Sequence, residues 1–339
     1  MIEKTLPLID LHRHLDGSIR LETILDLGKK HNIPLPADNP VTLRPFVQIT
    51  EPSPGVLAFF EKFEYMIGVL ADYDACSRVA YENVEDAFLE GIDYIELRFS
   101  PSFMAIPHQL DPVGVVEAII EGTDRARRNF DVNVNLIGIL SRTYGPDQCW
   151  EELESLLTCK DQITALDLAG DEVNYPGALF VDHFKEGREA GWRITVHAGE
   201  EGGPDSIWQA LEELGAERIG HGVSAAQDPL LMKYLAEHRI GIESNLTSNL
   251  QTRIINEYSE HPLRTFLEQD ILATINTDDP GISDIDLNYE YEFAAPSAGL
   301  SHQQITQAQK NSLKVAFLDE EEKSVLVEKA KLRSKEIDE

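Results

Sequence analysis

Short runs of apolar, often β-branched residues recur along the chain, and longer stretches with helical periodicity separate most of them. There are eight runs, covering residues 8–12, 94–100, 133–141, 163–169, 193–198, 217–221, 240–244 and 271–276. The last two are almost continuously apolar, as expected for parallel strands whose two faces are both covered. Strands alternating with helices in this way predict an α/β fold, a (β/α)8 TIM-type barrel, with a doubly wound open sheet as the alternative.

The stretches between the runs have the spacing of amphipathic helices. In 205–215, apolar residues recur at helical intervals, with Asp205 or Ser206 as a candidate N-cap and Gly215 as a candidate end. The same pattern occurs in 112–128, 177–191 and 228–238. These segments are the crossover helices that parallel strands require.

The interval between the first two runs is irregular. Six prolines within 34–54 predict an extended loop, and 55–72 then has the periodicity of a helix that carries Phe59, Phe60 and Phe63. One interpretation is a helix packed on the barrel. The other is a lid over the barrel mouth that excludes water and covers an apolar part of a ligand.

No Gly/Ser linker, repeat or low-complexity tract divides the 339 residues. We therefore predict a single barrel domain over 1–339, with a helical lid insertion at approximately 34–75. The 60 acidic and 29 basic residues give a net charge of −31, which repels phosphate backbones and anionic lipid. Nucleic-acid polymers and membranes are therefore not expected as partners.

Features of exported or membrane proteins are not found in the sequence. The first residues lack the basic and apolar regions of a secretory signal, and no apolar run approaches the ~18 residues of a membrane helix. Three irregularly spaced cysteines predict neither a disulfide framework nor a CxxC zinc site. A cytoplasmic location is therefore expected.

Metal-binding side chains stand where three of the predicted strands end. His12 and His14 share one face of the first strand, because alternate strand residues point the same way. His197 ends the fifth strand and Asp278 follows the eighth. Each is common alone, but barrel strands end at one mouth, where three imidazole nitrogens and a carboxylate suit zinc with an open position. Zinc lowers the pKa of its water to about 7.

Four further residues near these strand ends are candidate helpers. His221 either orients the water or is a structural histidine, and Glu200 is a proton shuttle if burial raises the pKa of its carboxyl. Asp279 either supports the ligands or hydrogen-bonds the substrate. Gly170 either lets a ligand approach the backbone or makes a strand-to-helix turn. Because the fourth strand offers no lysine to bridge a second metal, one zinc per subunit is predicted.

The chain resembles the adenosine deaminase family of the metal-dependent amidohydrolase superfamily, and most of all its bacterial members. The similarity runs in order through LHRHLDGS, IELRFSP, ITALDLAGDE, VHAGE, RIGHG, ESNLTSN and INTDDPG, which cover nearly the whole chain. It implies hydrolysis of adenosine and 2′-deoxyadenosine to inosine and 2′-deoxyinosine plus ammonia, a reaction of purine salvage. The implied partners are a small purine nucleoside and water.

The same resemblance implies the roles of the metal ligands and of the acid–base residues. Zn²⁺ is expected to be bound by His12, His14, His197 and Asp278. Glu200 is expected to donate a proton to purine N1. His221 is expected to assist the attacking hydroxide.

Substrate contacts are also implied by the resemblance. Gly170 is expected to contact purine N3 through its backbone, and Asp279 to hydrogen-bond N7. Asp16 is expected to hold the ribose 5′-hydroxyl, with His14 also near the sugar. The three phenylalanines of 55–72 resemble the apolar lid helix of the family.

Alternative functions remain open at this point. Related adenine deaminases and aminodeoxyfutalosine deaminases usually read HLEG where this chain reads HLDG at 14–17, which favours the nucleoside. Deamination of adenine or of another aminopurine is the alternative. A barrel that only binds ligands would be expected to have lost Glu200 or a metal ligand, and neither is lost. Asn245, where relatives often have cysteine, is expected to affect packing more than chemistry. The sequence leaves the oligomeric state open.

Overall fold

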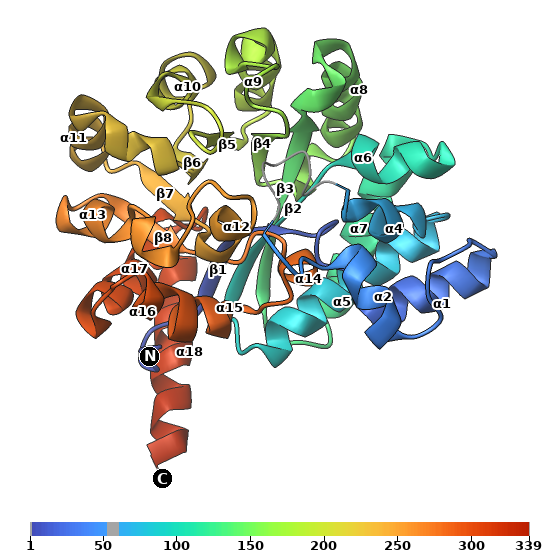
Figure 1. Cartoon of the computed structure of the whole chain (residues 1–339), viewed down its shortest axis with the longest axis horizontal. Coiled ribbons are helices and arrows are strands. Elements are labelled where there is room, and N and C mark those ends of the chain that lie inside the picture. Colours follow the sequence, from blue (N-terminus) through green and yellow to red (C-terminus); the bar gives the residue numbers. More distant parts are fainter. Residues whose placement is uncertain (1, 53–60, 339) are drawn as a thin grey trace.

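The computed structural model describes residues 2–52 and 61–338, and at its centre is a barrel of parallel strands ringed by helices (Figure 1). The strands pair in chain order, which confirms the predicted barrel. Their bounds are Ile9–His14 (β1), Tyr94–Phe99 (β2), Asn133–Ser141 (β3), Ala165–Ala169 (β4), Arg193–Ala198 (β5), Arg218–His221 (β6), Gly241–Ser244 (β7) and Leu272–Ile275 (β8). Each strand overlaps one of the predicted apolar runs.

Backbone hydrogen bonds beyond the end of β8 join it to β1. The N–H of His14 donates to the carbonyl of Asp278 at 2.8 Å, and the N–H of Asp278 donates to the carbonyl of His12 at 2.8 Å. Arg13 and Asp278 form the corresponding bridge. The closure of the barrel therefore places Asp278 between the two histidines of β1.

Helices connect the strands and form the outer layer. The α-helices are Leu21–His31 (α1), Pro40–Val47 (α2), Phe63–Gly68 (α4), Tyr73–Leu89 (α5), Pro101–Ala105 (α6), Pro112–Arg127 (α7), Pro146–Leu157 (α8), Val181–Glu189 (α9), Pro204–Gln209 (α10), Pro229–Glu237 (α11), Leu246–Gln251 (α12), Leu263–Glu268 (α13), Pro280–Ser283 (α14), Leu287–Tyr289 (α15), Ala295–Ser297 (α16), His302–Val315 (α17) and Glu320–Asp338 (α18). In the described ranges, no helix has both the length and the apolar character that crossing a membrane demands.

Shorter helical turns complete the connections. The 3₁₀ turns are Ile106–His108 (η1), Arg142–Tyr144 (η2), Lys160–Gln162 (η3), Gly177–Phe180 (η4), Val223–Gln227 (η6) and Tyr258–Glu260 (η7). Two segments are π-helical, Ala210–Leu214 (η5) and Glu290–Ala294 (η8).

The predicted extended loop over 34–54 is wrong in part, because it contains the helix α2. Pro40 occupies the first turn of α2, where the missing N–H of proline costs no hydrogen bond. The Asn39 side chain accepts the N–H of Thr42 at 3.1 Å and so caps the helix. The local capping residues therefore outweigh the proline content of the segment.

The helix predicted over 205–215 also starts differently. It begins at Pro204, and neither Asp205 nor Ser206 caps it. The helix then continues as the π-turn η5 and ends at Gly215, which has the left-handed conformation predicted for its end. The Ser206 hydroxyl is used for another contact, which is described below.

The segment after α17 closes the end of the barrel opposite the strand C-termini. The Phe317 side chain is buried against Ile137 and Ala165. The guanidinium of Arg218 stacks 3.6 Å from the centre of the Phe317 ring. From there α18 packs against the barrel through Leu326, which lies in one cluster with Ile9, Leu11 and Tyr94. Arg333 of α18 pairs with Asp93 at 2.6 Å, and the C-terminal end of the helix projects from the body of the molecule (Figure 1).

Gly122 provides a test of the outer packing, because an added Cβ there would overlap the backbone carbonyl of Ser77 in α5. We expect Gly122→Ala to lower the free energy of unfolding by about 1–3 kcal/mol, the usual range for overpacking. The matched control is Gly68→Ala in α4, where the added methyl group meets no atom within 4 Å. Urea unfolding of both variants gives the comparison, and equal stability of the two would contradict the packing described.

Candidate active site

The four predicted metal ligands lie together at the C-terminal ends of the strands. Asp278 Oδ1 is 3.1 Å from His12 Nε2 and 3.3 Å from His14 Nε2. The Nε2 atoms of His14 and His197 are 3.2 Å apart. Four atoms at zinc-ligand distances of about 2.0–2.1 Å in a tetrahedron are separated by about 3.3 Å, so these spacings suit one ion. In the described residues, two groups have donor atoms that all lie within 4.8 Å of one another: His12, His197, His221 and Asp278, and His14, Asp278 and Asp279. Asp278 belongs to both groups.

Two further observations fit a cation at this point. The Nε2 atom of His12 is buried and has no hydrogen-bond partner among the described residues. Burial alone would lower the pKa of His14, but Asp279, Asp278 and Asp16 raise it to about 9. The side chains therefore gather negative charge around a set of nitrogen donors, as a metal site does.

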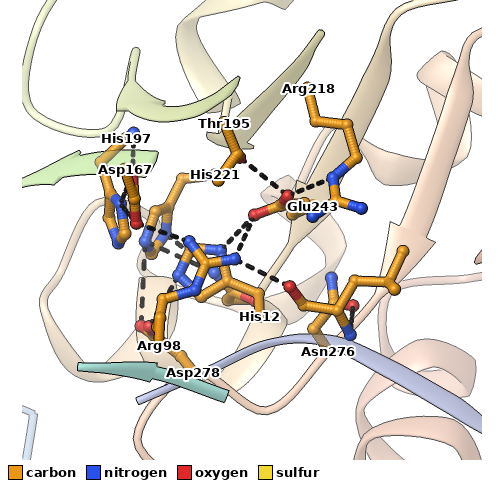
Figure 2. Close-up of polar contacts among 12 residues, drawn as sticks. His12, Arg98, Asp167, Thr195, His197, Arg218, His221, Glu243, Asn276 and Asp278 are labelled. Atoms are coloured by element: carbon orange, nitrogen blue, oxygen red, sulfur yellow. Dashed lines mark hydrogen bonds and ion pairs between the residues drawn. The ribbon is translucent and has the colours of Figure 1, made fainter. Parts of the chain in front are cut away.

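The other ring nitrogens of two of these histidines face buried carboxylates, as Figure 2 shows. His12 Nδ1 is 2.7 Å from Glu243 Oε2, and His197 Nδ1 is 3.0 Å from Asp167. Carboxylates accept hydrogen bonds, so each Nδ1 carries the hydrogen. The Nε2 lone pairs are then left free to bind a metal.

The guanidinium of Arg98 links the two carboxylates. It donates to Asp167 and to Glu243, each at 2.8 Å, and to the carbonyl of Leu11 at 2.7 Å. Burial would raise the pKa of Glu243, but Arg98 and Arg218 hold it well below its usual value. Both carboxylates therefore stay ionised and keep the imidazoles oriented.

Sequence reasoning assigned no role to Asp167, Glu243 or Arg98, although all three lie within quoted motifs. Each interrupts an apolar strand, in LDL, IES and ELR. A charged residue in a strand covered on both faces must have a buried partner, because an unpaired charge is costly there. That signal identifies paired residues but does not tell which ones contact each other.

Glu200 and His221 are brought together by α12. His221 Nδ1 is 3.5 Å from Glu200 Oε1, and the amide of Asn249 lies 3.0 Å from the same nitrogen. Asn249 is also 3.4 Å from Glu200 Oε1. Burial, followed by the charge of Asp278, raises the pKa of Glu200 well above its usual value.

The orientation of the Asn249 amide is fixed by His261. The N–H of Leu263 donates to His261 Nδ1 at 3.1 Å, and His261 Nε2 is 3.3 Å from Asn249 Oδ1. Burial lowers the pKa of His261 to about 3, so its ring is neutral and carries its hydrogen on Nε2. Asn249 therefore presents its N–H₂ group to His221, which accepts through Nδ1 and keeps its own hydrogen on Nε2.

Asn245 lies beside the same histidine. Its amide nitrogen is 3.4 Å from both ring nitrogens of His221, and its Oδ1 is buried with no hydrogen-bond partner among the residues that the structure describes. The residue thus contacts a candidate catalytic group directly. The expectation that Asn245 affects packing more than chemistry stays a prediction.

The remaining predicted residues line one cavity at the barrel mouth. The walls include Asp16, Gly170, Asp279, Glu200 and Phe63. The described part of the predicted helix 55–72 is helical over α4, whose Phe63 ring packs against Phe103 at 5.4 Å between centres. Phe59 and Phe60 lie outside the described residues.

Asp279 enters the cavity because Gly17 has no side chain. A Cβ at Gly17 would overlap the Asp279 carboxylate. The Oδ1 of Asp279 is buried and has no hydrogen-bond partner within the described ranges. Burial, together with Asp278, raises the pKa of Asp279 well above its usual value. An acid in this state suits hydrogen bonding to a ligand rather than to the protein.

His221 and Asp278 both adopt the left-handed backbone conformation, with φ of 61° and 67°. For residues with a Cβ this conformation costs roughly 1–3 kcal/mol each and persists where surrounding contacts require it. His221 is the last residue of β6, Asp278 lies three residues beyond the end of β8, and both line the cavity. Strain therefore coincides with the residues on which chemistry would depend.

Comparison with known proteins identifies the family. The family model described as adenosine deaminase matches residues 7–332. The chain is 58% identical to an adenosine deaminase of Klebsiella pneumoniae, covering 97% of this chain and 99% of the relative. An adenosine deaminase of Vibrio cholerae is 58% identical, with 98% and 100% covered. The chain belongs to the adenosine deaminase family.

Solved structures of the same fold are more distant in sequence. An adenine deaminase from Arthrobacter aurescens superposes with a TM-score of 0.88 at 24% identity, covering 97% of this chain and 99% of that one. The N6-methyl-AMP deaminase of Arabidopsis thaliana superposes with a TM-score of 0.82 at 25% identity, covering 98% of each. An amidohydrolase from Burkholderia ambifaria, solved with bound zinc, has a TM-score of 0.86 at 23% identity, covering 98% and 92%.

A substitution of Arg98 tests the buried ion pairs that orient the imidazoles of His12 and His197. We expect Arg98→Gln to lower the free energy of unfolding by about 3–5 kcal/mol, because it leaves Asp167 and Glu243 buried without their common partner. The matched control is Arg78→Gln, which breaks a partly exposed pair with Glu82 and should cost about 1 kcal/mol or less. Urea unfolding measures both, and a similar small loss for the two variants would contradict the role of Arg98.

Proposed function

We propose that the chain catalyses the hydrolytic deamination of adenosine and 2′-deoxyadenosine, giving inosine or 2′-deoxyinosine and ammonia. The observation that carries this proposal is the 58% identity to adenosine deaminases over 97% of the chain. The gathering of the predicted residues around one cavity supports it. They include candidates for the proton donor, for the residue that orients the water and for the contacts to the substrate.

The metal in this proposal is one zinc ion, held by the four ligands predicted from the sequence, His12, His14, His197 and Asp278. Three imidazole nitrogens and one carboxylate oxygen are a donor set that suits catalytic zinc. The unpartnered, buried Nε2 of His12 supports this assignment. When bound, zinc supplies Lewis-acid activation of water near neutral pH.

Glu200 is the proposed proton donor to purine N1. Its raised pKa favours the neutral carboxylic acid at pH 7, which is the form that can donate a proton. The side chain is only 12% exposed, so bulk water has little access to the proton it holds. Protonation of N1 weakens the aromatic ring and makes C6 open to attack by water.

His221 is proposed to steer that water. Because Asn249 occupies its Nδ1, the remaining hydrogen is on Nε2, the nitrogen that lies 3.8 Å from Asp278 Oδ2. An Nε2–H in this place can hydrogen-bond the oxygen that approaches C6. Through this N–H, the neutral ring also stabilises the negative charge that develops during the attack. A neutral ring does not compete with Glu200 as a proton donor.

Asp279 is proposed to recognise purine N7. N7 accepts hydrogen bonds only, so the aspartate must be protonated to donate to it. The raised pKa of Asp279 provides that form, and its unpartnered Oδ1 leaves an atom available for the contact. Gly170, which also lines the cavity, would present its backbone to N3.

Asp16 is proposed to bind the ribose 5′-hydroxyl. It is buried and accepts the N–H of Ser100 at 3.3 Å, which fixes its carboxyl at the cavity wall. The cavity wall includes no lysine or arginine among the described residues. A neutral nucleoside fits such a wall better than a nucleotide, whose phosphate would find carboxylates there but neither lysine nor arginine.

The choice of substrate can be tested by following the ultraviolet change on deamination. We expect turnover of adenosine and 2′-deoxyadenosine to exceed that of adenine at the same enzyme concentration, and to be lost when a chelator removes the metal. Re-addition of zinc should restore it. Faster turnover of adenine would replace the proposed substrate, and full activity of the verified metal-free protein would exclude the proposed metal chemistry.

Glu200→Gln tests the proton donor. The amide keeps the shape of the side chain but has no acidic proton, so kcat for adenosine should fall by at least ~10²-fold, as is typical of lost acid–base catalysis. Zinc content and inosine binding should stay close to those of the unmodified protein. Unchanged kcat would remove Glu200 from the mechanism.

A further inference from the structure

The carboxylate of Glu172 lies behind the loop that carries Glu200, and the proposed mechanism gives it no role. It ends the motif LDLAGDE after β4 and is 7% exposed. Its Oε1 accepts the backbone N–H of Gly199 at 2.6 Å. Its Oε2 accepts those of Glu200 at 3.1 Å, Glu201 at 3.1 Å and Gly202 at 2.9 Å. Four consecutive backbone amides therefore point at one carboxylate.

We call the four backbone amides of residues 199–202 the nest. Two neighbouring residues, Ser206 and Gly202, show that the surroundings of the nest fit the carboxylate of Glu172. The Ser206 hydroxyl, in the first turn of α10, donates to Glu172 Oε1 at 2.5 Å and ties the helix to the loop. A Cβ at Gly202 would lie 2.5 Å from the same oxygen, so a side chain there would displace the carboxylate. The carboxylate of Glu172 is thus contacted both by the backbone of the loop and by the helix α10 that follows it.

The physical effect of such a nest is to immobilise the loop. Consecutive N–H groups that converge on one point form an anion site, and bonds to an ionised acceptor are roughly twice as strong as neutral ones. Without Glu172, the partly buried amides of residues 200–202 would lack this acceptor, and the amide of Gly199 would keep only the Ser206 hydroxyl, 3.0 Å away. A displacement of about 1 Å in a catalytic group costs on the order of 10²-fold in rate, so the position of this loop matters for Glu200.

We propose that Glu172 is a positioning residue that holds the carboxyl of Glu200 in place by binding the backbone amides of residues 199–202. This inference rests on the proposed function for its effect on rate. The negative charge of Glu172 also helps Glu200 to keep its proton, after the larger influences of burial and of Asp278. Glu172 itself does not line the cavity and acts only through the loop.

Glu172→Gln tests the inference, because the amide keeps the size of the side chain but turns one acceptor oxygen into a donor that faces N–H groups. We expect kcat for adenosine to fall at least ~10-fold while KM changes less than ~3-fold and zinc content stays constant. The matched control is Glu201→Gln, which removes the same charge from a side chain outside the nest and should leave kcat within ~2-fold. Equal kcat in Glu172→Gln and the unmodified protein would overturn the proposal.

A double-mutant cycle distinguishes positioning from general structural damage. If Glu172 acts through Glu200, adding Glu172→Gln to Glu200→Gln should lower kcat by less than ~2-fold further, because two residues that act as a unit are not additive. The same fold-loss in both backgrounds would mean that Glu172 acts independently of Glu200, and would overturn the proposal.

Amide hydrogen exchange provides a measurement that does not depend on activity. The N–H groups of residues 199–202 should exchange at least ~10-fold faster in Glu172→Gln than in the unmodified protein, with β5 unchanged. If adenosine is not turned over at all, the proposed function fails, while unchanged exchange would overturn the nest itself. Should Glu172→Gln not fold, Ser206→Ala removes a single donor to Oε1. Because the Ser206 hydroxyl also accepts the N–H of Gly199, the comparison uses residues 200–202 only. Faster exchange at 200–202 in that variant would support the nest, and unchanged exchange would overturn it.

Discussion

The candidate site depends on one buried guanidinium, that of Arg98, which lies between Asp167 and Glu243 inside the barrel. These carboxylates orient His197 and His12, so Arg98 links the orientation of two imidazoles, while Arg218 also pairs with Glu243 at 2.7 Å. Burying charges costs several kcal/mol for each ion, and close pairing only offsets that cost. The network is therefore better understood as a device for orientation than as a source of stability. Its residues come from β2, β4 and β7, which only a closed barrel brings into contact.

The loop that carries Glu200 is held by a different kind of interaction from the one that orients the imidazoles. Around the metal ligands, side chains pair with side chains, whereas Glu200 stands on a loop whose backbone amides bind Glu172. An ion pair restricts rotation about the side-chain bonds of a histidine and so fixes the direction of its ring nitrogen. A metal ligand requires such a fixed direction. Backbone amides fix the path of the chain, which suits a carboxyl that must exchange a proton and return to the same place. His221 lies between the two halves and contacts both Glu200 and Asp278.

Much of the fold and of the candidate site could be predicted from the sequence, and the features that were missed have physical reasons. Apolar runs predicted all eight strands, because parallel strands covered on both faces leave a clear signal. The same argument placed His12 and Asp278 at one mouth, since the strand ends of a barrel converge. The helix α2 was missed because Asn39 and a first-turn proline outweigh a proline-rich composition. Such capping effects extend over only a few residues, so average composition hides them.

The supporting residues could not be predicted in the same way, because their roles are pairings across the barrel. Glu243 is only a charged residue in an apolar strand until its contact with Arg98, 145 positions away, is known. The four amides that bind Glu172 leave little trace in the sequence, because every residue type except proline supplies an N–H. Only Gly202, which must lack a side chain beside the carboxylate, records that arrangement. It follows that the groups proposed to perform the chemistry can be found from residue type and strand position. The groups that give it precision are found only where the fold brings distant segments together.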